Sequence, residues 1–146
     1  MRAAGVGALR GAMDDLSTLI DTEHTFERTV EADDCITFLS DRFEGVPPSL
    51  ATPRMILWME HTCRDAIGPQ LPEFHDSVGI RVEVAHLGAT PLGKTVTFTA
   101  KVVAVDGKKV RFAVAARDPE KLVGEGFHER HVIDVVRFAR KLGAKS

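Results

Sequence analysis

The fold follows from one stretch of sequence, TPRMILWMEHTCRDAIGP, residues 52–69. Its apolar side chains recur at the three- and four-residue spacing of a helix. Thr52-Pro53 opens it as a hydroxyl N-cap followed by proline at the first helical position, and Gly68-Pro69 ends it near residue 67. Because the apolar face is wide, we expect the rest of the chain to wrap this helix. Glu60 interrupts the apolar surface and therefore needs an explanation.

Strand patterns fill most of the remaining sequence. Apolar and polar side chains alternate over residues 24–31, 80–86, 96–102 and 110–116, and a further strand is expected over 122–134. Asp106-Gly107 is a strong signal for a two-residue hairpin turn, and Gly124 and Gly126 indicate a bulge or a close approach of backbones. A short amphipathic helix is expected over 135–142. One long early helix followed by an antiparallel meander predicts an α+β fold in which a sheet covers the helix.

Two segments are expected to lack regular structure. Residues 1–20 begin with a run rich in small side chains and are predicted to be a flexible extension, which leaves a single domain over 21–146. Residues 35–49 combine Phe38, Leu39 and Phe43 with glycine and prolines. That mixture predicts a loop whose apolar side chains pack over another part of the protein.

The composition is that of a soluble domain with no polyanionic partner. The 146 residues carry a net charge of −2, which argues against nucleic-acid and membrane-surface binding. No apolar run approaches the ~20 residues that a membrane helix requires. Cys35 and Cys63 show no metal or redox spacing and are predicted to be reduced core residues. The N-terminus lacks the apolar core of a secretory signal, so we expect a cytoplasmic protein.

Polar side chains with chemical potential stand within apolar elements at four positions. Thr52 begins the helix, Glu60 lies eight residues later, His86 ends a strand, and Arg130 lies inside the last strand. A hydroxyl, a carboxylate and an imidazole together perform acyl-transfer chemistry. Each residue also has a purely structural interpretation: a cap, an exposed side chain, a hydrogen-bonded histidine at a strand end, and the partner of a structural carboxylate.

A shared metal is not expected in the last strand. His128 and His131 are three residues apart, and on a strand this spacing directs them to opposite faces.

Three stretches carry a resemblance to a known family: LATPRMILWMEHTCRDAIGPQL, SVGIRVEVAHLGATPLGKTVTFTA and GEGFHERHVI. Over residues 50–141 the chain resembles the hotdog-fold thioesterases, in the branch that contains fluoroacetyl-CoA thioesterase. The turn HLGATPLG and the strand GFHER are the more specific pieces. The resemblance implies a hotdog fold, with an antiparallel sheet wrapped around the central helix and two subunits paired into one longer sheet.

The resemblance also assigns roles to individual positions. The catalytic threonine, glutamate and histidine of the family fall on Thr52, Glu60 and His86, its active-site glycine on Gly79 and its strand arginine on Arg130. The aromatic gate of the fluoroacetyl enzyme falls on Val46, with an aromatic retained slightly earlier at Phe43. Its glycine after the catalytic threonine is proline here. We therefore expect Gly79, Arg130, Val46 and Phe43 to line the substrate site.

The expected activity is hydrolysis of a small acyl-CoA thioester to the free acid and CoA by a cytoplasmic homodimer. No metal or cofactor is expected, and coenzyme A enters only as part of the substrate. A non-catalytic acyl-CoA-binding module is one alternative, and it would tolerate the loss of Glu60 and His86. A dehydratase acting on hydroxyacyl thioesters is a weaker one, because the Asp-x-x-x-x-His pattern of that group is absent.

Overall fold

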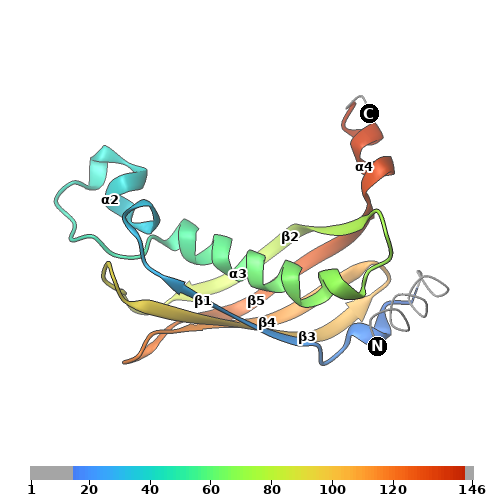
Figure 1. Ribbon diagram of the computed structural model, residues 1–146, viewed down its shortest axis with the longest axis horizontal. Coiled ribbons are helices and arrows are strands. Elements are labelled where there is room, and N and C mark those ends of the chain that lie inside the picture. Colours follow the sequence, from blue (N-terminus) through green and yellow to red (C-terminus); the bar gives the residue numbers. More distant parts are fainter. Residues whose placement is uncertain (1–14, 144–146) are drawn as a thin grey trace.

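One long helix, α3 (Thr52–Ile67), lies in the concave face of a curved antiparallel sheet (Figure 1). The computed structural model describes residues 15–143. The five strands are β1 (Glu23–Thr29), β2 (His75–His86), β3 (Thr95–Asp106), β4 (Lys109–Arg117) and β5 (Leu122–Asp134). They follow the order β1-β3-β4-β5-β2. The predicted α+β arrangement, with the sheet around the helix, is confirmed.

Alternation along the central strands builds the core. In β3 the side chains of Val96, Phe98, Ala100 and Val102 are buried, and in β4 those of Val110, Phe112, Val114 and Ala116. They pack against the buried face of α3, which includes Met55, Met59, Cys63 and Ile67. Burying each large apolar side chain stabilises the fold by roughly 1.5–3 kcal/mol. The predicted hairpin turn is also present, with Gly107 in the left-handed region at φ 62° and Asp106 paired with Lys109.

Close backbone approach explains the two glycines of β5. A Cβ on Gly124 would lie 2.6 Å from Met55 Sδ and 2.8 Å from the Ala85 carbonyl oxygen. A Cβ on Gly126 would overlap the backbone of Glu83 in the neighbouring strand. The last strand therefore needs glycine where α3 and β2 press against it.

The two edges of the sheet differ in character. The exposed side chains of β1 are those of Glu23, Thr25, Glu27 and Thr29. The β2 edge instead exposes Ile80 and Val82, at 51% and 44% of their surface. Beside them, the pairing of β2 with β5 is interrupted by a register shift between Gly79 and Arg81. One edge of the sheet is thus polar and the other carries apolar side chains.

The flexible extension predicted over residues 1–20 does not reach as far as residue 20. Residues 1–14 lie outside the described part of the chain. Leu16 precedes a short 3-10 helix (Ser17–Leu19) and Leu19 is its last residue. Both leucines are fully buried in the core. Two backbone hydrogen bonds, from Asp21 to Val102 and from Val102 to Thr22, fix the chain that follows against β3. Residues 15–20 therefore belong to the folded domain, because their two leucines cover its open end.

The loop before α3 also departs from expectation. Residues 35–49 contain the short helix α2 (Ile36–Leu39) and a 3-10 turn (Asp41–Phe43), and Figure 1 shows this segment extending beyond one end of the sheet. Phe38 is 63% exposed and Phe43 44%, so within a single chain these side chains do not pack over the domain. At the opposite end α4 (Val135–Lys141) projects from the body. None of the helices in residues 15–143 is long and apolar enough to span a bilayer.

Candidate active site

Thr52 and His86 meet where the N-terminus of α3 approaches the C-terminal end of β2. Thr52 Oγ1 lies 2.7 Å from His86 Nδ1, within a short hydrogen bond. The other ring nitrogen of His86, Nε2, is buried and has no hydrogen-bond partner among the described residues. Burial lowers the pKa of His86, and the nearby Gly88 backbone offsets part of the shift. A neutral imidazole beside a hydroxyl is an arrangement suited to general-base catalysis.

Thr52 is not the N-cap that the sequence predicted. The cap position is Ala51, with extended backbone at ψ 145°, and its carbonyl accepts the first helical hydrogen bonds from Arg54 and Met55. Thr52 is therefore the first residue of the helix, and no side chain caps this end. The Thr52 hydroxyl is directed to His86 instead of to the helix backbone.

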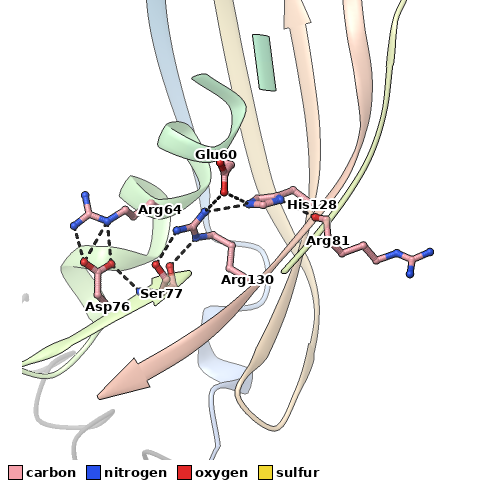
Figure 2. A network of polar contacts seen from close by, with 7 residues as sticks. All are labelled: Glu60, Arg64, Asp76, Ser77, Arg81, His128 and Arg130. Carbon is pink, nitrogen blue, oxygen red and sulfur yellow. Dashed lines mark hydrogen bonds and ion pairs between the residues drawn. The ribbon is translucent and has the colours of Figure 1, made fainter. Parts of the chain in front are cut away.

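Glu60 belongs to a second polar cluster further along α3 (Figure 2). Its Oε2 lies 3.2 Å from Arg130 Nη1 and 3.7 Å from His128 Nε2. Arg130 and His128 are buried on the inner face of β5, whereas the Glu60 side chain is 37% exposed. The Glu60 carboxylate thus has a buried cation as its partner.

Arg130 is held from two sides by groups of the protein. Its Nε donates to Ser77 Oγ and its Nη2 to the Ser77 carbonyl, both at 2.7 Å, while Nη1 is shared between Glu60 and His128. Figure 2 shows the chain of contacts continuing outward, from Ser77 to Asp76 and on to Arg64. Within the described chain, the hydrogen-bond partners of the Arg130 guanidinium are therefore Glu60, His128 and Ser77.

Gly79 provides the space that Glu60 occupies. A Cβ built on Gly79 would overlap Glu60 Oε2 and would lie 3.1 Å from His128 Cε1. Only glycine at this position leaves room for the carboxylate against β2. The structure thus brings Gly79, Glu60 and Arg130 together, as a group distinct from the pair of Thr52 and His86.

Helix geometry separates these two groups. Thr52 and Glu60 are eight residues apart on α3, which corresponds to about 12 Å along the axis at 1.5 Å per residue. Val46 and Phe43 lie in the exposed loop before α3, at 41% and 44% exposure. Neither has a contact with Glu60 or His86 that places it in a site within one chain.

His128 and Ser77 are two members of the cluster that sequence reasoning missed. The sequence pattern raises His128 only as one half of a possible metal pair with His131. The prediction that the two side chains lie on opposite faces of the strand is confirmed, since His128 is buried and His131 is exposed. A usable signal was present: His128 and Arg130 share the parity of the buried Val132, so both must enter the core and both need partners there. Ser77 gave no comparable signal.

Comparison with known proteins agrees with this architecture. A family model described as fluoroacetyl-CoA-specific thioesterase matches residues 30–136. The fluoroacetyl-CoA thioesterase of Streptantibioticus cattleyicolor is 37% identical over 107 residues, which cover 73% of this chain and 77% of the relative. The chain belongs to this thioesterase family. Its predicted activity as an acyl-CoA thioester hydrolase is thereby confirmed.

Solved structures of this family and of its neighbours confirm the hotdog fold. A structure of the fluoroacetyl-CoA thioesterase superposes with a TM-score of 0.81 at 33% identity, covering 87% of this chain and 96% of that one. A hot-dog-like protein from Thermanaerovibrio acidaminovorans gives a TM-score of 0.80 at 29% identity, with coverages of 88% and 95%.

Proposed function

We propose that this thioesterase hydrolyses a small acyl-CoA thioester with Thr52, Glu60 and His86 as its catalytic groups. The observation that carries the proposal is the 2.7 Å contact between Thr52 Oγ1 and His86 Nδ1. His86, kept neutral by burial, accepts the proton of the Thr52 hydroxyl or of a water held beside it. The oxygen so activated attacks the thioester carbonyl, and the protonated imidazole then delivers its proton to the departing CoA thiolate. Attack by water gives the free acid directly. Attack by Thr52 gives an acyl-threonine ester, which a water deprotonated by His86 then hydrolyses to the acid and the free threonine hydroxyl.

Glu60 supplies a carboxylate to the same reaction. Its Oε2 is bound by Arg130, and its partial exposure leaves the group accessible to a bound substrate. We propose that Glu60 meets a Thr52–His86 pair in a pocket built between two copies of the chain, and that it either charges and orients the His86 imidazole there or acts directly as the base or nucleophile. Both roles require a positioned carboxylate, and the hydrogen bond from Arg130 holds it in place.

Backbone N–H groups are proposed to stabilise the oxyanion. In the first turn of α3, Arg54 and Met55 donate to the Ala51 carbonyl, and Pro53 has no N–H. Thr52 N–H is the remaining donor of that turn, and no acceptor for it occurs among residues 15–143. This N–H lies at the N-terminal end of α3, where the partial positive charge of the helix dipole stabilises an anion. The Gly79 N–H is a second candidate, since glycine permits close approach of a ligand.

We propose that the active enzyme is a homodimer formed through β2. The apolar edge at Ile80 and Val82 supports this arrangement. The separation of Glu60 from Thr52 and His86 within one chain also supports a homodimer. A pocket built between two copies would bring groups from both chains to one substrate. Phe43 and Val46, exposed in one chain, are then available to line the acyl pocket.

The proposed reaction needs no metal and no redox cofactor, because hydrolysis transfers no electrons. Coenzyme A takes part only as the leaving group of the substrate. We propose that the enzyme is cytoplasmic. Cys35 and Cys63 are both free thiols, which is the form expected in a reducing compartment.

Free-thiol release from short, branched, aromatic and halogenated acyl-CoAs tests the proposal. The wild type is compared with Thr52→Ala, Glu60→Ala and His86→Ala. Thr62→Val is the control, because Thr62 is buried in α3 and its hydroxyl bonds only the Trp58 carbonyl within residues 15–143. We expect kcat to fall at least ~10²-fold in the Glu60 and His86 variants and to change little in the control. Acyl-CoA binding without turnover of any thioester by the wild type would instead identify a binding module.

A further inference from the structure

The ring of His128 is fixed in one tautomer by the bulge of β2. His128 is 2% exposed, and its Nδ1 lies 2.8 Å from the carbonyl oxygen of Arg81. Arg81 follows directly on the register shift in the pairing of β2 with β5. Because a carbonyl oxygen can only accept a hydrogen bond, Nδ1 must carry the ring proton.

The other ring nitrogen is consequently an acceptor for Arg130. Arg130 Nη1 lies 3.1 Å from His128 Nε2 and 3.2 Å from Glu60 Oε2. Nη1 carries two hydrogens, so it can donate one to the ring and one to the carboxylate. Burial, followed by the Arg130 charge, lowers the pKa of His128, and this outweighs the Arg81 carbonyl, which raises it. The ring is therefore neutral, and its lone pair faces the guanidinium.

The remaining donors of Arg130 leave the guanidinium little freedom. Nε and Nη2 are bound by Ser77 at 2.7 Å each. If His128 offered no lone pair, the second hydrogen of Nη1 would be buried without an acceptor, and Glu60 would be the nearest group able to satisfy it. Both carboxylate oxygens would then be drawn toward the arginine.

We propose that His128 is a positioning residue for Glu60. By accepting one N–H of Arg130, the neutral imidazole restricts the arginine to a single hydrogen bond with Glu60 Oε2. Glu60 Oε1, for which no partner occurs in the described chain, stays available to the substrate. The inference rests on the proposed catalytic role of Glu60, and His128 itself does not touch the reacting atoms.

Two substitutions separate the two ends of the ring. In His128→Asn the amide lies near the position of Nδ1, so the donor to Arg81 is kept and the acceptor for Arg130 is lost. His128→Gln reaches to the position of Nε2 and restores an acceptor there. We expect kcat of His128→Asn to fall about 10- to 100-fold with KM within about threefold of wild type. His128→Gln should recover kcat to within about fivefold.

A second set of variants distinguishes positioning from a general structural effect. His131→Asn makes the same chemical change on an exposed face of β5 and should leave kcat at the wild-type value. In a Glu60→Ala background, His128→Asn should cause no further loss beyond about twofold, because its effect passes through Glu60. An equal loss in both backgrounds, or equal losses in the Asn and Gln variants, would overturn the inference.

The ring proton can also be located without any substitution. Nitrogen-15 imidazole spectra of the wild-type protein at pH 7 should show His128 as the Nδ1–H tautomer, and an Nε2–H or doubly protonated ring would contradict the proposal. Wild-type activity in Glu60→Ala would remove the catalytic role of Glu60 itself. An inactive Glu60→Ala beside a fully active His128→Asn would reject only the role of His128.

Discussion

Gly79 shows how a missing side chain shapes the candidate site. Glu60 Oε2 occupies the space that a Cβ would fill, and Arg130 and His128 of the neighbouring strand also approach this oxygen. The carboxylate is thus confined between the backbone of β2 and two buried side chains of β5. Because Glu60 is the flexible member of this contact, a side chain at position 79 would displace the carboxylate rather than the strand.

Gly79→Ala should therefore lower activity much more than stability. We expect kcat to fall by about tenfold or more, since a displacement of about 1 Å in a catalytic group has effects of that size, with only a small change in Tm. Gly68→Ala is the matched control, because a Cβ there would meet nothing within 4 Å. Steady-state kinetics and thermal unfolding of both variants check the prediction. Full activity of Gly79→Ala would show that Glu60 need not occupy its observed place.

Two histidines with lowered pKa values, the half-buried His86 and the buried His128, make stability depend on pH. The pKa values of His86 and His128 are both lowered in the folded protein, chiefly by burial. Between those values and the ordinary imidazole pKa of about 6.5 the unfolded chain binds more protons than the folded one, so stability falls as the pH decreases through this range. Urea unfolding between pH 8 and pH 5.5 should show the loss.

Replacing one of the two rings tests this assignment. His128→Gln should make the free energy of unfolding less dependent on pH over the same range, because one of the titrating groups is gone. The carboxyl groups with lowered pKa values, such as Asp76, act only at more acidic pH. A free energy of unfolding that rises on acidification from pH 8 would refute the assignment.

Local spacing identifies residues that stand out against their surroundings, but not the neighbours that support them. Glu60 and Arg130 were recognisable as charges within apolar elements, and the structure pairs them with each other. Thr52 was recognised, but as a cap, because a sequence cannot show that the helix begins one residue earlier than the hydroxyl suggests. Ser77 acts through its backbone carbonyl as well as its hydroxyl, and a carbonyl leaves no trace in sequence.

A buried carboxylate joins the elements around the start of α3. Asp34 is fully buried and accepts hydrogen bonds from Arg28 of β1, from the Glu31 backbone and from Trp58 of α3. Its own carbonyl accepts from Ala51, the residue before Thr52. Arg28 in turn stacks over the Trp58 ring at 4.4 Å. Burial raises the pKa of Asp34, but the hydrogen bonds led by Arg28 lower it overall.

Removing this carboxylate should destabilise the whole N-terminal half of the fold. We expect Asp34→Ala to reduce the free energy of unfolding by about 3 kcal/mol, because several donors lose their common acceptor and Arg28 loses its buried partner. The exposed Asp41→Ala serves as the control and should change it by less than about 0.5 kcal/mol. Denaturant unfolding measures both. A loss below about 1 kcal/mol for Asp34→Ala would show that Arg28 and Trp58 find other partners.

Strands were predictable where one face is buried and the other is not. The strand expected over 122–134 matches β5 at both ends, whereas the alternation over 80–86 predicted only the second half of β2. The first half, from His75 to Gly79, contributes Ser77 and Gly79 to the polar cluster, and polar side chains on an inner face disrupt the alternation on which strand prediction depends. The polar residues of the site are therefore the reason why the first half of β2 was not predicted.

The molecule as a whole should exist in solution as a pair of chains. Light scattering coupled to size exclusion should give about 32 kDa, twice the chain mass of 16.0 kDa. Ile80→Lys combined with Val82→Lys places charges on the apolar edge of β2 and should shift the mass toward that of one chain. Thr25→Lys on the opposite, polar edge is the control and should leave the mass unchanged. A wild-type mass of 16 kDa at micromolar concentration would contradict the proposed homodimer.

The unequal edges of the sheet also set a limit on assembly. A sheet whose two edges can both pair with another chain can add copies indefinitely. Here β1 ends the sheet with glutamates and threonines, and only β2 presents isoleucine and valine. Once two copies have joined along β2 neither has an apolar edge left to offer. In the proposed homodimer growth stops at the first addition, so the edge that favours association also disfavours the formation of fibres.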